Sequence, residues 1–227
     1  MMKKVLSATT GLLLALSLCL TALSGILWVL GTTPDIMLPM MRRFAPGETT
    51  GLPDEEYPEM VHMITRYLAG DVKEFQHRYI ADGELIEAFQ PHEQQHMADC
   101  LALFQLDWRV LVAAGLLSLW LLLIVLLWWK ERQVWRWCVT GLGALIAAVA
   151  LVAVAAMADF NRLFILFHEL SFSNDLWLLD PRTDLLIRLM PTNFFTTYAA
   201  ILGVSWLALM GLMLAAALML SKKGAKA

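Results

Sequence analysis

The sequence predicts an α-helical polytopic membrane protein with four transmembrane helices, and three observations support this fold class. First, 59% of its 227 residues are hydrophobic. Second, the apolar residues fall into four runs, each about 20 residues long, which is the length needed to cross ~30 Å of hydrocarbon. Third, Lys and Arg cluster beside alternate ends of these runs. The four predicted spans are residues 9–31, 109–129, 137–158 and 199–220.

The basic residues set the predicted orientation. They lie before the first span, between the second and third, and after the fourth, at Lys3, Lys4, Lys130, Arg132, Arg136, Lys222, Lys223 and Lys226. The positive-inside rule therefore predicts that both termini are cytoplasmic, an N-in/C-in topology. Within a single membrane domain of residues 1–227, residues 32–108 form an extracytoplasmic cap and residues 159–198 an extracytoplasmic interfacial loop. The net charge of −3 gives no indication of a nucleic-acid partner.

The first span is expected to be an anchor rather than a cleaved signal peptide. Its basic start and the segment Ala22-Leu23-Ser24 resemble signal-peptide features. However, the apolar run continues to Leu30, which is longer than a typical signal-peptide core. The chain should therefore keep this helix.

The three cysteines do not predict a disulfide. Cys19 and Cys138 fall inside or at the edge of predicted spans, which leaves Cys100 alone on the outer side. Bulky Leu18 before Cys19 also argues against lipoprotein processing there.

The predicted cap has recognisable elements of mixed type. Residues 54–69 have apolar side chains at helical spacing, and Pro91 is placed to begin a helix that continues into the second span. Between them, the alternation from Phe75 to Leu85 suggests short strands. In the later loop, the stretch from Thr183 to Met190 suits a short amphipathic helix along the outer interface. There, Asp180 and Asp184 are interpreted as a cap and a surface charge.

One short motif suggests a metal site. His92-Glu93-Gln94-Gln95-His96 reads as H-E-x-x-H, which in zinc proteases supplies two ligands and a glutamate base from one helix face. A third ligand would have to come from His168 or Glu169. Against this interpretation, the motif lies in the first turn after Pro91 with polar flanks. A membrane zinc metalloprotease is therefore kept as an alternative.

Two histidines are candidates for acid–base chemistry. His96 has a carboxylate, Asp99, one helical turn further along, which can hold an imidazole tautomer and raise its basicity. His168 lies in a strongly apolar segment, where an unpaired polar ring is costly. Each is therefore a plausible partner for the other. The remaining histidines, His62, His77 and His92, are interpreted as surface residues.

Two blocks of sequence resemble a known family. Residues 93–99 read Glu-x-x-His-Met-x-Asp, and residues 167–181 read Phe-His-Glu-x-x-Phe-x-Asn-Asp-x-Trp-Leu-Leu-Asp-Pro, followed by Pro-x-x-Phe-Phe at 191–195. Together with four spans in this orientation, the pattern resembles the bacterial DUF1461 family, which includes lipoprotein intramolecular transacylases. Cys100 departs from the family pattern, where a valine is expected.

The resemblance implies a defined reaction in the bacterial plasma membrane, with the active site facing the outer leaflet. An acyltransferase of this family takes a diacylated lipoprotein and moves the sn-2 acyl chain from glycerol to the α-amine of the lipid-bearing cysteine. No soluble cofactor is needed, because ester aminolysis is downhill. By this resemblance His96 and His168 form the catalytic pair, with Asp99, Glu93 and Asp184 in supporting positions. We expect His96 to be the base and His168 the oxyanion donor or acid, or the reverse.

A non-enzymatic membrane sensor or scaffold is the remaining alternative. It predicts that replacing His96 or His168 changes stability alone. The transacylase interpretation can dispense with His92 and Glu93, whereas the protease interpretation requires both. Membrane lipid is an expected partner under the enzyme interpretation, and the oligomeric state does not follow from the sequence.

Overall fold

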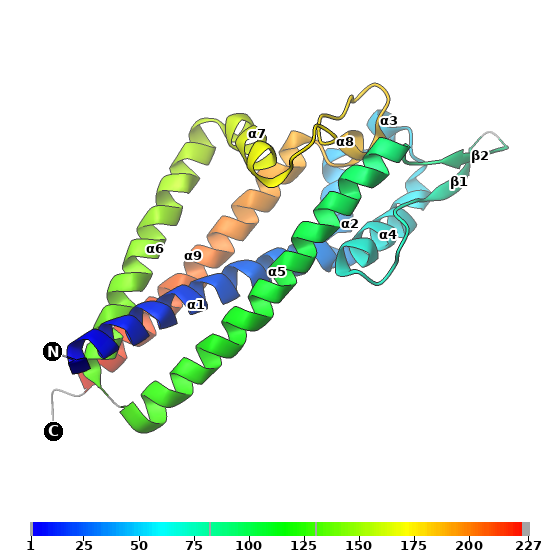
Figure 1. Cartoon of the computed structure of the whole chain (residues 1–227). Coiled ribbons are helices and arrows are strands. Elements are labelled where there is room, and N and C mark those ends of the chain that lie inside the picture. Colours follow the sequence, from blue (N-terminus) through cyan, green and yellow to red (C-terminus); the bar gives the residue numbers. More distant parts are fainter. Residues whose placement is uncertain (1, 82, 130, 224–227) are drawn as a thin grey trace. The chain divides into compact units, whose positions relative to one another are not determined.

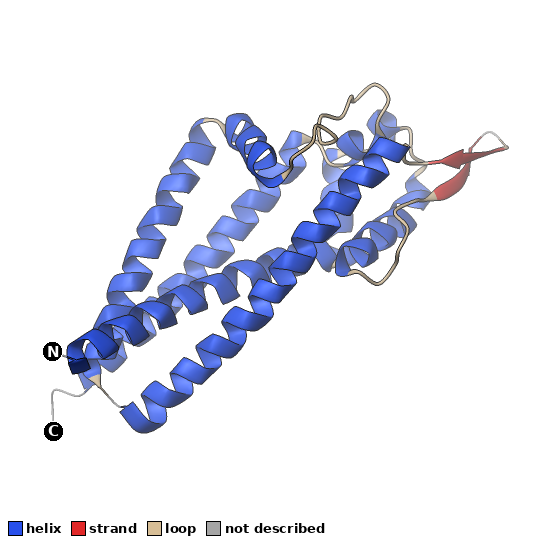
Figure 2. Ribbon diagram, in the orientation of Figure 1, coloured by secondary structure: helices blue, strands red, loops and turns tan. Residues whose placement is uncertain are grey.

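The computed structural model describes residues 2–81, 83–129 and 131–223, and it is almost entirely helical (Figures 1 and 2). Four of its helices are long and apolar enough to cross a membrane, as predicted, and they are α1, α5, α6 and α9. The elements are α1 (Met2–Thr32), α2 (Pro34–Phe44), α3 (Gly47–Thr50), η1 (Asp54–Glu56), α4 (Tyr57–Ala69), β1 (Arg78–Ala81), β2 (Glu84–Glu87), α5 (Pro91–Leu123), the π-helical η2 (Ile124–Trp129), α6 (Arg132–Ala158), α7 (Phe160–Ser171), α8 (Leu185–Leu189) and α9 (Thr192–Lys223).

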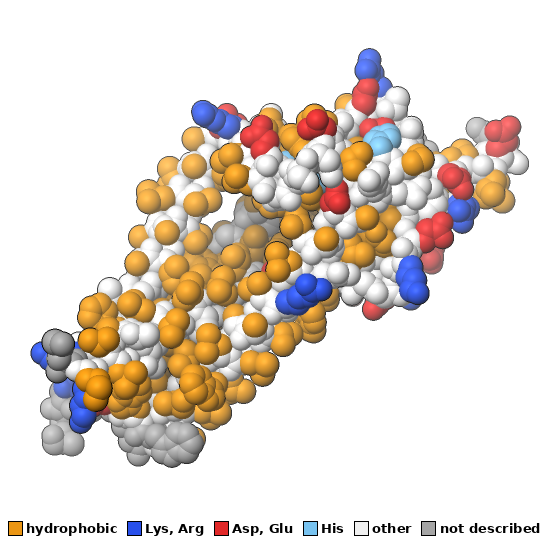
Figure 3. All heavy atoms as spheres, viewed as in Figure 1, with side chains coloured by type: hydrophobic (Ala, Val, Ile, Leu, Met, Phe, Trp, Pro, Cys, Tyr) orange, Lys and Arg blue, Asp and Glu red, His pale blue; other side chains and the backbone are white. Residues whose placement is uncertain are grey.

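The chain divides into two compact units, which we describe separately. Unit 1 comprises Met1–Leu27, Asp107–Ala158 and Ile201–Ala227, so it holds most of the four long helices. Its core is apolar, with Leu14 and Ala15 of α1 fully buried in it. Outward-facing hydrophobic side chains cover the visible face of these helices in Figure 3, as expected where lipid replaces water.

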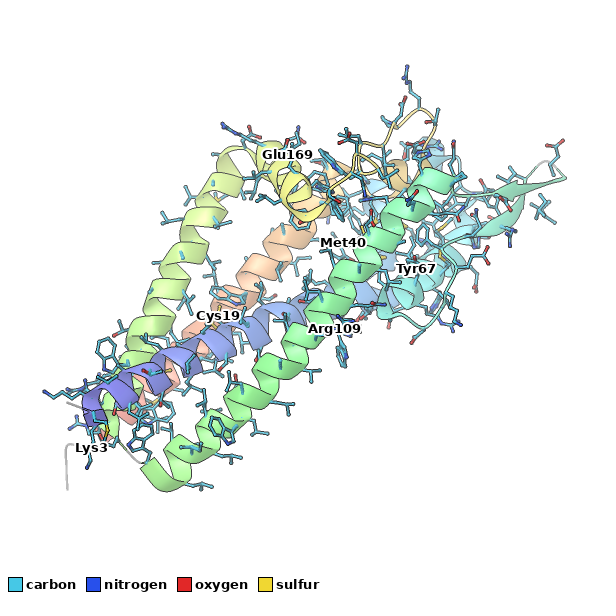
Figure 4. The ribbon with its side chains drawn as sticks, viewed as in Figure 1. Lys3, Cys19, Met40, Tyr67, Arg109 and Glu169 are labelled. Atoms are coloured by element: carbon cyan, nitrogen blue, oxygen red, sulfur yellow. The ribbon has the colours of Figure 1, made fainter. Side chains whose placement is uncertain are left out.

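Most basic residues of unit 1 gather at one end, and the exception is Arg109 of α5, which Figure 4 labels away from Lys3. Figure 1 shows α1 and α6 beginning, and α9 ending, at the same end, where Lys3 is labelled in Figure 4. The side chain of Arg132 donates from Nε to the carbonyl oxygen of Ser221 at 3.0 Å, which ties these two helix ends together. Lys130 and Lys226, two of the residues behind the orientation prediction, lie outside the described residues. The described basic residues fit the charge clustering from which the topology was predicted.

Close packing of α1 against α6 depends on small residues. A Cβ atom added at Gly141 would lie 2.7 Å from Cβ of Ala15, closer than real Cβ atoms approach. Small residues at such crossings let transmembrane helices come near enough for extensive van der Waals contact. We therefore expect Gly141→Leu to lower the free energy of unfolding by about 1–3 kcal/mol through overpacking. Thermal unfolding in detergent measures this.

The matched control is on the same helix. A Cβ atom at Gly143 would meet nothing within 4 Å. Gly143→Leu should therefore leave the midpoint of unfolding unchanged or raise it, because leucine is the better helix former. Equal destabilisation by both substitutions would contradict the packing argument.

Unit 2 comprises Trp28–Leu106 and Asp159–Ala200 and has its own apolar core. The helix predicted over residues 54–69 is present as η1 followed by α4, and its predicted apolar face is buried. α4 ends at Gly70, whose φ of 82° is the left-handed conformation that glycine adopts without steric cost. Tyr57, fully buried at the start of α4, donates its hydroxyl hydrogen bond to the carbonyl of Ala45.

The strands foreseen near residues 75–85 form a two-stranded antiparallel hairpin, although it lies slightly later, at β1 and β2. Ile80 pairs with Leu85 in its register, and both side chains are largely exposed. His77, the residue directly before β1, binds Glu56 through Nε2 at 2.8 Å, and the side chain of His77 is only 13% exposed. The interpretation of His77 as a surface residue was therefore wrong, whereas His62 is exposed as expected.

Helix α5 is longer than a membrane crossing requires. Its 33 residues extend roughly 50 Å at 1.5 Å per residue, against ~30 Å of hydrocarbon. The surplus is at its beginning, where Pro91 occupies the first position as predicted and polar side chains follow. α5 thus carries a polar extension in unit 2 ahead of its apolar stretch.

Two short helices complete unit 2. α7 was not foreseen, yet its start has a recognisable cap, because the side chain of Asp159 accepts a hydrogen bond from the backbone N–H of Arg162 at 3.0 Å. α8 is shorter than the predicted helix over residues 183–190 but falls within it. α7 and the start of α5 carry the residues considered next.

Candidate active site

The structure brings together His96 of α5 and His168 of α7, both in unit 2. Their ring centroids are 6.2 Å apart, and only 7% of His96 and 8% of His168 is exposed. Two imidazoles close together and shielded from water are unusual without a functional reason, because burying a polar ring costs free energy unless it is hydrogen-bonded. The pairing predicted from the sequence is therefore present.

Aromatic rings surround His168. Those of Phe164, Phe167, Phe172 and Trp177 lie with centroids 4.2, 5.2, 5.5 and 5.0 Å from its own. Burial in this setting disfavours the charged ring and lowers the pKa of His168, with the hydrogen bond to Phe164 opposing it. His168 is thus a neutral base at ordinary pH.

The tautomer of His168 follows from that hydrogen bond. Its Nδ1 lies 2.7 Å from the carbonyl oxygen of Phe164, one turn earlier in α7. A carbonyl can only accept, so Nδ1 carries the hydrogen, and in the neutral ring Nε2 keeps its lone pair. His168 therefore presents a basic nitrogen of fixed identity.

His96 is held differently. Its Nε2 lies 3.6 Å from Sγ of Cys100, and the ring of Phe172 meets it edge-on at 5.2 Å. Its Nδ1 is buried and has no hydrogen-bond partner within the described part of the chain. An orphaned buried nitrogen in a native fold calls for an explanation, and one explanation is a group supplied by the substrate.

Asp99 hydrogen-bonds to another residue than the predicted His96, although its charge still acts on that ring: burial lowers the pKa of His96 to about 4, His168 adds to this, and the charge of Asp99 opposes it. Its Oδ2 accepts a hydrogen bond from Nδ2 of Asn174 at 2.9 Å, and Oδ1 of Asn174 in turn accepts from the backbone N–H of Leu176 at 3.1 Å. The carboxylate lies one turn from His96, but the segment after α7 occupies it. Asp99 is therefore hydrogen-bonded to the segment that carries Phe172 and Trp177.

Glu93 is fully buried and serves two backbone groups. Its Oε2 accepts from the N–H of Gln90 at 2.8 Å, as the glutamate of a helix capping box does, and its Oε1 accepts from the N–H of Leu186 at 2.7 Å. Glu93 thereby fixes the beginning of α5 to the beginning of α8. The protease interpretation needs this carboxylate as a free base, and here it is already engaged.

Asp184 completes the attachment of α8. The carboxylate is 2% exposed and accepts from the backbone N–H of Asp180 and the hydroxyl of Thr183, while His92 binds it through Nε2 at 3.0 Å. Burial alone would raise the pKa of Asp184, but these bonds outweigh it and hold the pKa below its usual range. Asp184 is thus buried rather than a surface charge, and His92 is its half-exposed partner.

The other candidates for a metal site do not converge. Glu169, labelled in Figure 4, is exposed on α7, whereas His168 beside it is buried. Over residues 2–81, 83–129 and 131–223, no group of three or more His, Cys, Asp and Glu side chains is arranged to hold a metal ion. Asp180 forms an exposed pair with Arg182. All three cysteines are free, as predicted.

Sequence reasoning placed Phe172 in the apolar setting of His168 but missed two other contributors to the site, Trp177 and Asn174. Both belong to the block that carried the family resemblance, so their signal was present but had no assigned role in the site. Two cavities, of about 350 and 400 Å³, lie beside Pro46 and Asp54, and neither histidine lines them. Both rings are covered, because only 7% of His96 and 8% of His168 is exposed.

Comparison with known proteins identifies the family. The family model described as "Lipoprotein intramolecular transacylase Lit" matches residues 12–195, which is most of the chain and includes both histidines. The chain belongs to the Lit family. It is accordingly a multi-pass membrane acyltransferase of the lipoprotein intramolecular transacylase class. No curated protein matches the chain.

Solved structures of a Lit protein share the fold. The membrane-integral Lit from Bacillus cereus has a TM-score of 0.79 at 17% identity, with 98% of this chain and 99% of that chain covered. Two further structures of that protein carry a histidine replaced by arginine or by alanine. They have TM-scores of 0.75 and 0.76 at 17% identity, covering 98% and 100% of this chain and 95% and 98% of theirs. At this identity the likeness establishes the Lit fold.

The environment of His168 makes a prediction for its titration. Because burial lowers its pKa, we expect its midpoint to fall below the ordinary value of 6.5, with the neutral ring present above that midpoint. Nuclear magnetic resonance of protein with labelled histidine, in detergent, measures this, and the spectrum of His168→Gln assigns the signal. A midpoint at or above 6.5 would contradict the argument.

Proposed function

We propose that this Lit family member moves the sn-2 acyl chain of an S-diacylglyceryl-cysteine lipoprotein to the α-amine of that cysteine, with His168 as base and His96 as oxyanion donor. The observation that carries the assignment is the hydrogen bond between Nδ1 of His168 and the carbonyl of Phe164, because it leaves Nε2 as a lone-pair acceptor. Of the two assignments that the sequence left open, this is the second. It also fits Asp99, which is turned toward Asn174 rather than toward His96.

The first half of the reaction forms the new bond. The amine nitrogen attacks the sn-2 carbonyl carbon, Nε2 of His168 accepts a proton from that nitrogen, and the carbonyl electron pair moves onto oxygen. The resulting oxyanion needs a hydrogen-bond donor, and we assign this role to Nδ1 of His96, which is buried and has no hydrogen-bond partner among the described residues. A donor with no other partner in the resting enzyme is free for this task.

The second half breaks the old bond. The tetrahedral intermediate collapses, the bond from the carbonyl carbon to the glycerol oxygen breaks, and the imidazolium of His168 returns its proton to that oxygen. A substrate ammonium starts with three protons. One stays on the amide, one goes to the glycerol hydroxyl and one is released to water. The product is an N-acylated, S-monoacylglyceryl lipoprotein.

Positioning should supply much of the rate. Amine and ester belong to one molecule, so holding them together converts the attack into an intramolecular step, which can lower barriers by several kcal/mol. The aromatic rings around His168 exclude water from the reacting groups and favour the neutral amine over the ammonium. The segment carrying Phe172 and Trp177 must be displaced for the substrate to reach the rings.

Lipid contact is expected at α7. α6 ends at Ala158 and α7 begins at Phe160, so α7 starts within two residues of the end of a transmembrane helix. One side of it exposes large apolar residues, including Leu170 at 79%, whereas His168 is buried. An amphipathic helix of this kind lies in the membrane interface.

With the basic end of the long helices cytoplasmic, the site faces the outer leaflet, where diacylated lipoproteins are anchored.

The experiment is the analysis of a reporter lipoprotein from a host that makes only diacylated lipoproteins. Substrate and product have equal mass, because the acyl group moves within one molecule, so tandem mass spectrometry must locate it on the amine or on glycerol. We expect the wild-type chain to give N-acyl peptide and His168→Ala to give none.

The matched control is His62→Ala, which removes an exposed histidine from α4 and should behave as wild type. Unchanged diacylated peptide with folded, membrane-inserted wild-type protein would overturn the proposal. Full activity of both His96→Ala and His168→Ala would favour a scaffold instead.

A further inference from the structure

We propose that Cys100 is a positioning residue, whose thiol hydrogen bonds to Nε2 of His96 and thereby holds His96 in the tautomer that carries its hydrogen on Nδ1. This inference rests on the proposed function, and it deepens the role given to His96. It concerns the residue that departs from the family pattern. It also explains why one nitrogen of a 93% buried histidine has a partner and the other has none.

The geometry places the thiol at the right nitrogen. Cys100 follows His96 by four residues on α5, so the two side chains share a helix face, and Sγ lies 3.6 Å from Nε2. The thiol packs against the apolar core of unit 2, which leaves little water to compete for it. Within the described hydrogen bonds, His96 is the partner of this sulfur.

The direction of the hydrogen bond follows from the chemistry of the two groups. Sulfur is a weak acceptor, whereas an unprotonated imidazole nitrogen is a good one. The stronger of the two possible hydrogen bonds is therefore the one in which the thiol of Cys100 donates to Nε2 of His96. The neutral ring must then carry its hydrogen on Nδ1. Because the two ring nitrogens point in divergent directions, that N–H is turned away from Cys100.

This tautomer is the one that the reaction needs. Nε2 of His168 already serves as the proton acceptor. A lone pair on Nδ1 of His96 would only repeat that role, whereas an N–H there supplies the donor that the oxyanion needs. Nδ1 of His96 has no partner in the resting protein, so it need not break a bond to stabilise the oxyanion. Cys100 acts on the reaction through His96 and does not itself touch the reacting atoms.

The test compares Cys100→Ala with Cys100→Ser. Alanine removes the donor and serine restores one in a side chain of similar size. One such bond corresponds to roughly a 2- to 10-fold effect, so we expect Cys100→Ala to lower kcat by that factor with KM unchanged, and Cys100→Ser to recover it. The substrate is a synthetic dipalmitoyl lipopeptide in detergent micelles.

A second readout does not depend on activity. In protein labelled with ¹⁵N histidine, long-range proton–nitrogen spectra distinguish the two neutral tautomers, and His96→Asn assigns the signals. We expect wild-type His96 to be the Nδ1–H form and Cys100→Ala to show a mixture of both. If the wild-type protein showed these tautomers but no N-acylated product, the proposed function would fail while the inference stood.

Three results would overturn the inference. The first is a wild-type His96 that carries its hydrogen on Nε2. The second is a Cys100→Ala protein whose tautomer and kcat match those of wild type. The third is an equal loss of kcat in Cys100→Ala and Cys100→Ser with the tautomer of His96 unchanged, because the role of Cys100 would then be packing alone.

Discussion

His168→Gln should abolish acyl transfer, whereas His96→Asn should leave measurable activity. Glutamine cannot accept the proton that Nε2 of His168 takes from the amine, and loss of a general base costs ~10²- to 10⁴-fold in rate. Asparagine places an amide N–H near the position of Nδ1 of His96, so it can still donate to the oxyanion. The two substitutions therefore separate a base from a donor.

The size of the effect at His96 can be bounded with alanine. Removal of one oxyanion donor costs ~10²- to 10³-fold in kcat, and His96→Ala should show a loss of that order. His96→Asn should recover a large part of it. Rates are measured as N-acyl peptide formed per unit time from a synthetic diacylated lipopeptide, with His62→Ala as the control for substitution of an exposed histidine.

The opposite pattern would reverse the assignment. If His168→Gln kept activity while His96→Asn was as inactive as His96→Ala, then His96 would be the base. Each variant must first show a wild-type unfolding midpoint in detergent, because both rings are buried and their replacement could disturb unit 2.

The sequence predicts what is local in the chain. Span length and Lys/Arg placement were enough for the four long helices, because crossing a bilayer constrains length and composition directly. The apolar face of residues 54–69 and the start at Pro91 also depend on neighbours within one or two turns, and both are confirmed. Asp159 carried a capping signal for α7 that was available in the sequence and went unused.

The hydrogen-bond partners in the site are not local, and there the sequence misled. Asp99 stands one turn from His96, which favoured a direct bond, but its actual partner is Asn174, 75 residues away. Glu93 likewise looked like a protease base in a five-residue motif, and its second partner is Leu186, 93 residues away. Choice among partners depends on how α7 and α8 fold back onto α5, which helical spacing does not report.

Replacement of Glu93 should have the largest effect on stability. Its carboxylate is fully buried and accepts two backbone hydrogen bonds, from Gln90 at 2.8 Å and Leu186 at 2.7 Å. Hydrogen bonds to a charged group contribute about 1.5–3 kcal/mol each, and an unsatisfied buried donor adds a desolvation penalty. Glu93→Ala should therefore lower the free energy of unfolding by several kcal/mol. Glu93→Gln should also destabilise, because its amide turns a donor toward one of the two N–H groups.

The matched control is Glu169→Gln, which makes the same chemical change at an exposed position on α7. Thermal unfolding in detergent should separate the two variants clearly, and limited proteolysis should cut residues 172–184 faster in Glu93→Gln. That segment is tied to α5 at Asp99 near its start and at His92 and Glu93 near its end, so release of one end exposes it. A protease base predicts the reverse, because Glu93→Gln would then leave the fold intact. Wild-type stability of Glu93→Gln would contradict the structural role proposed here.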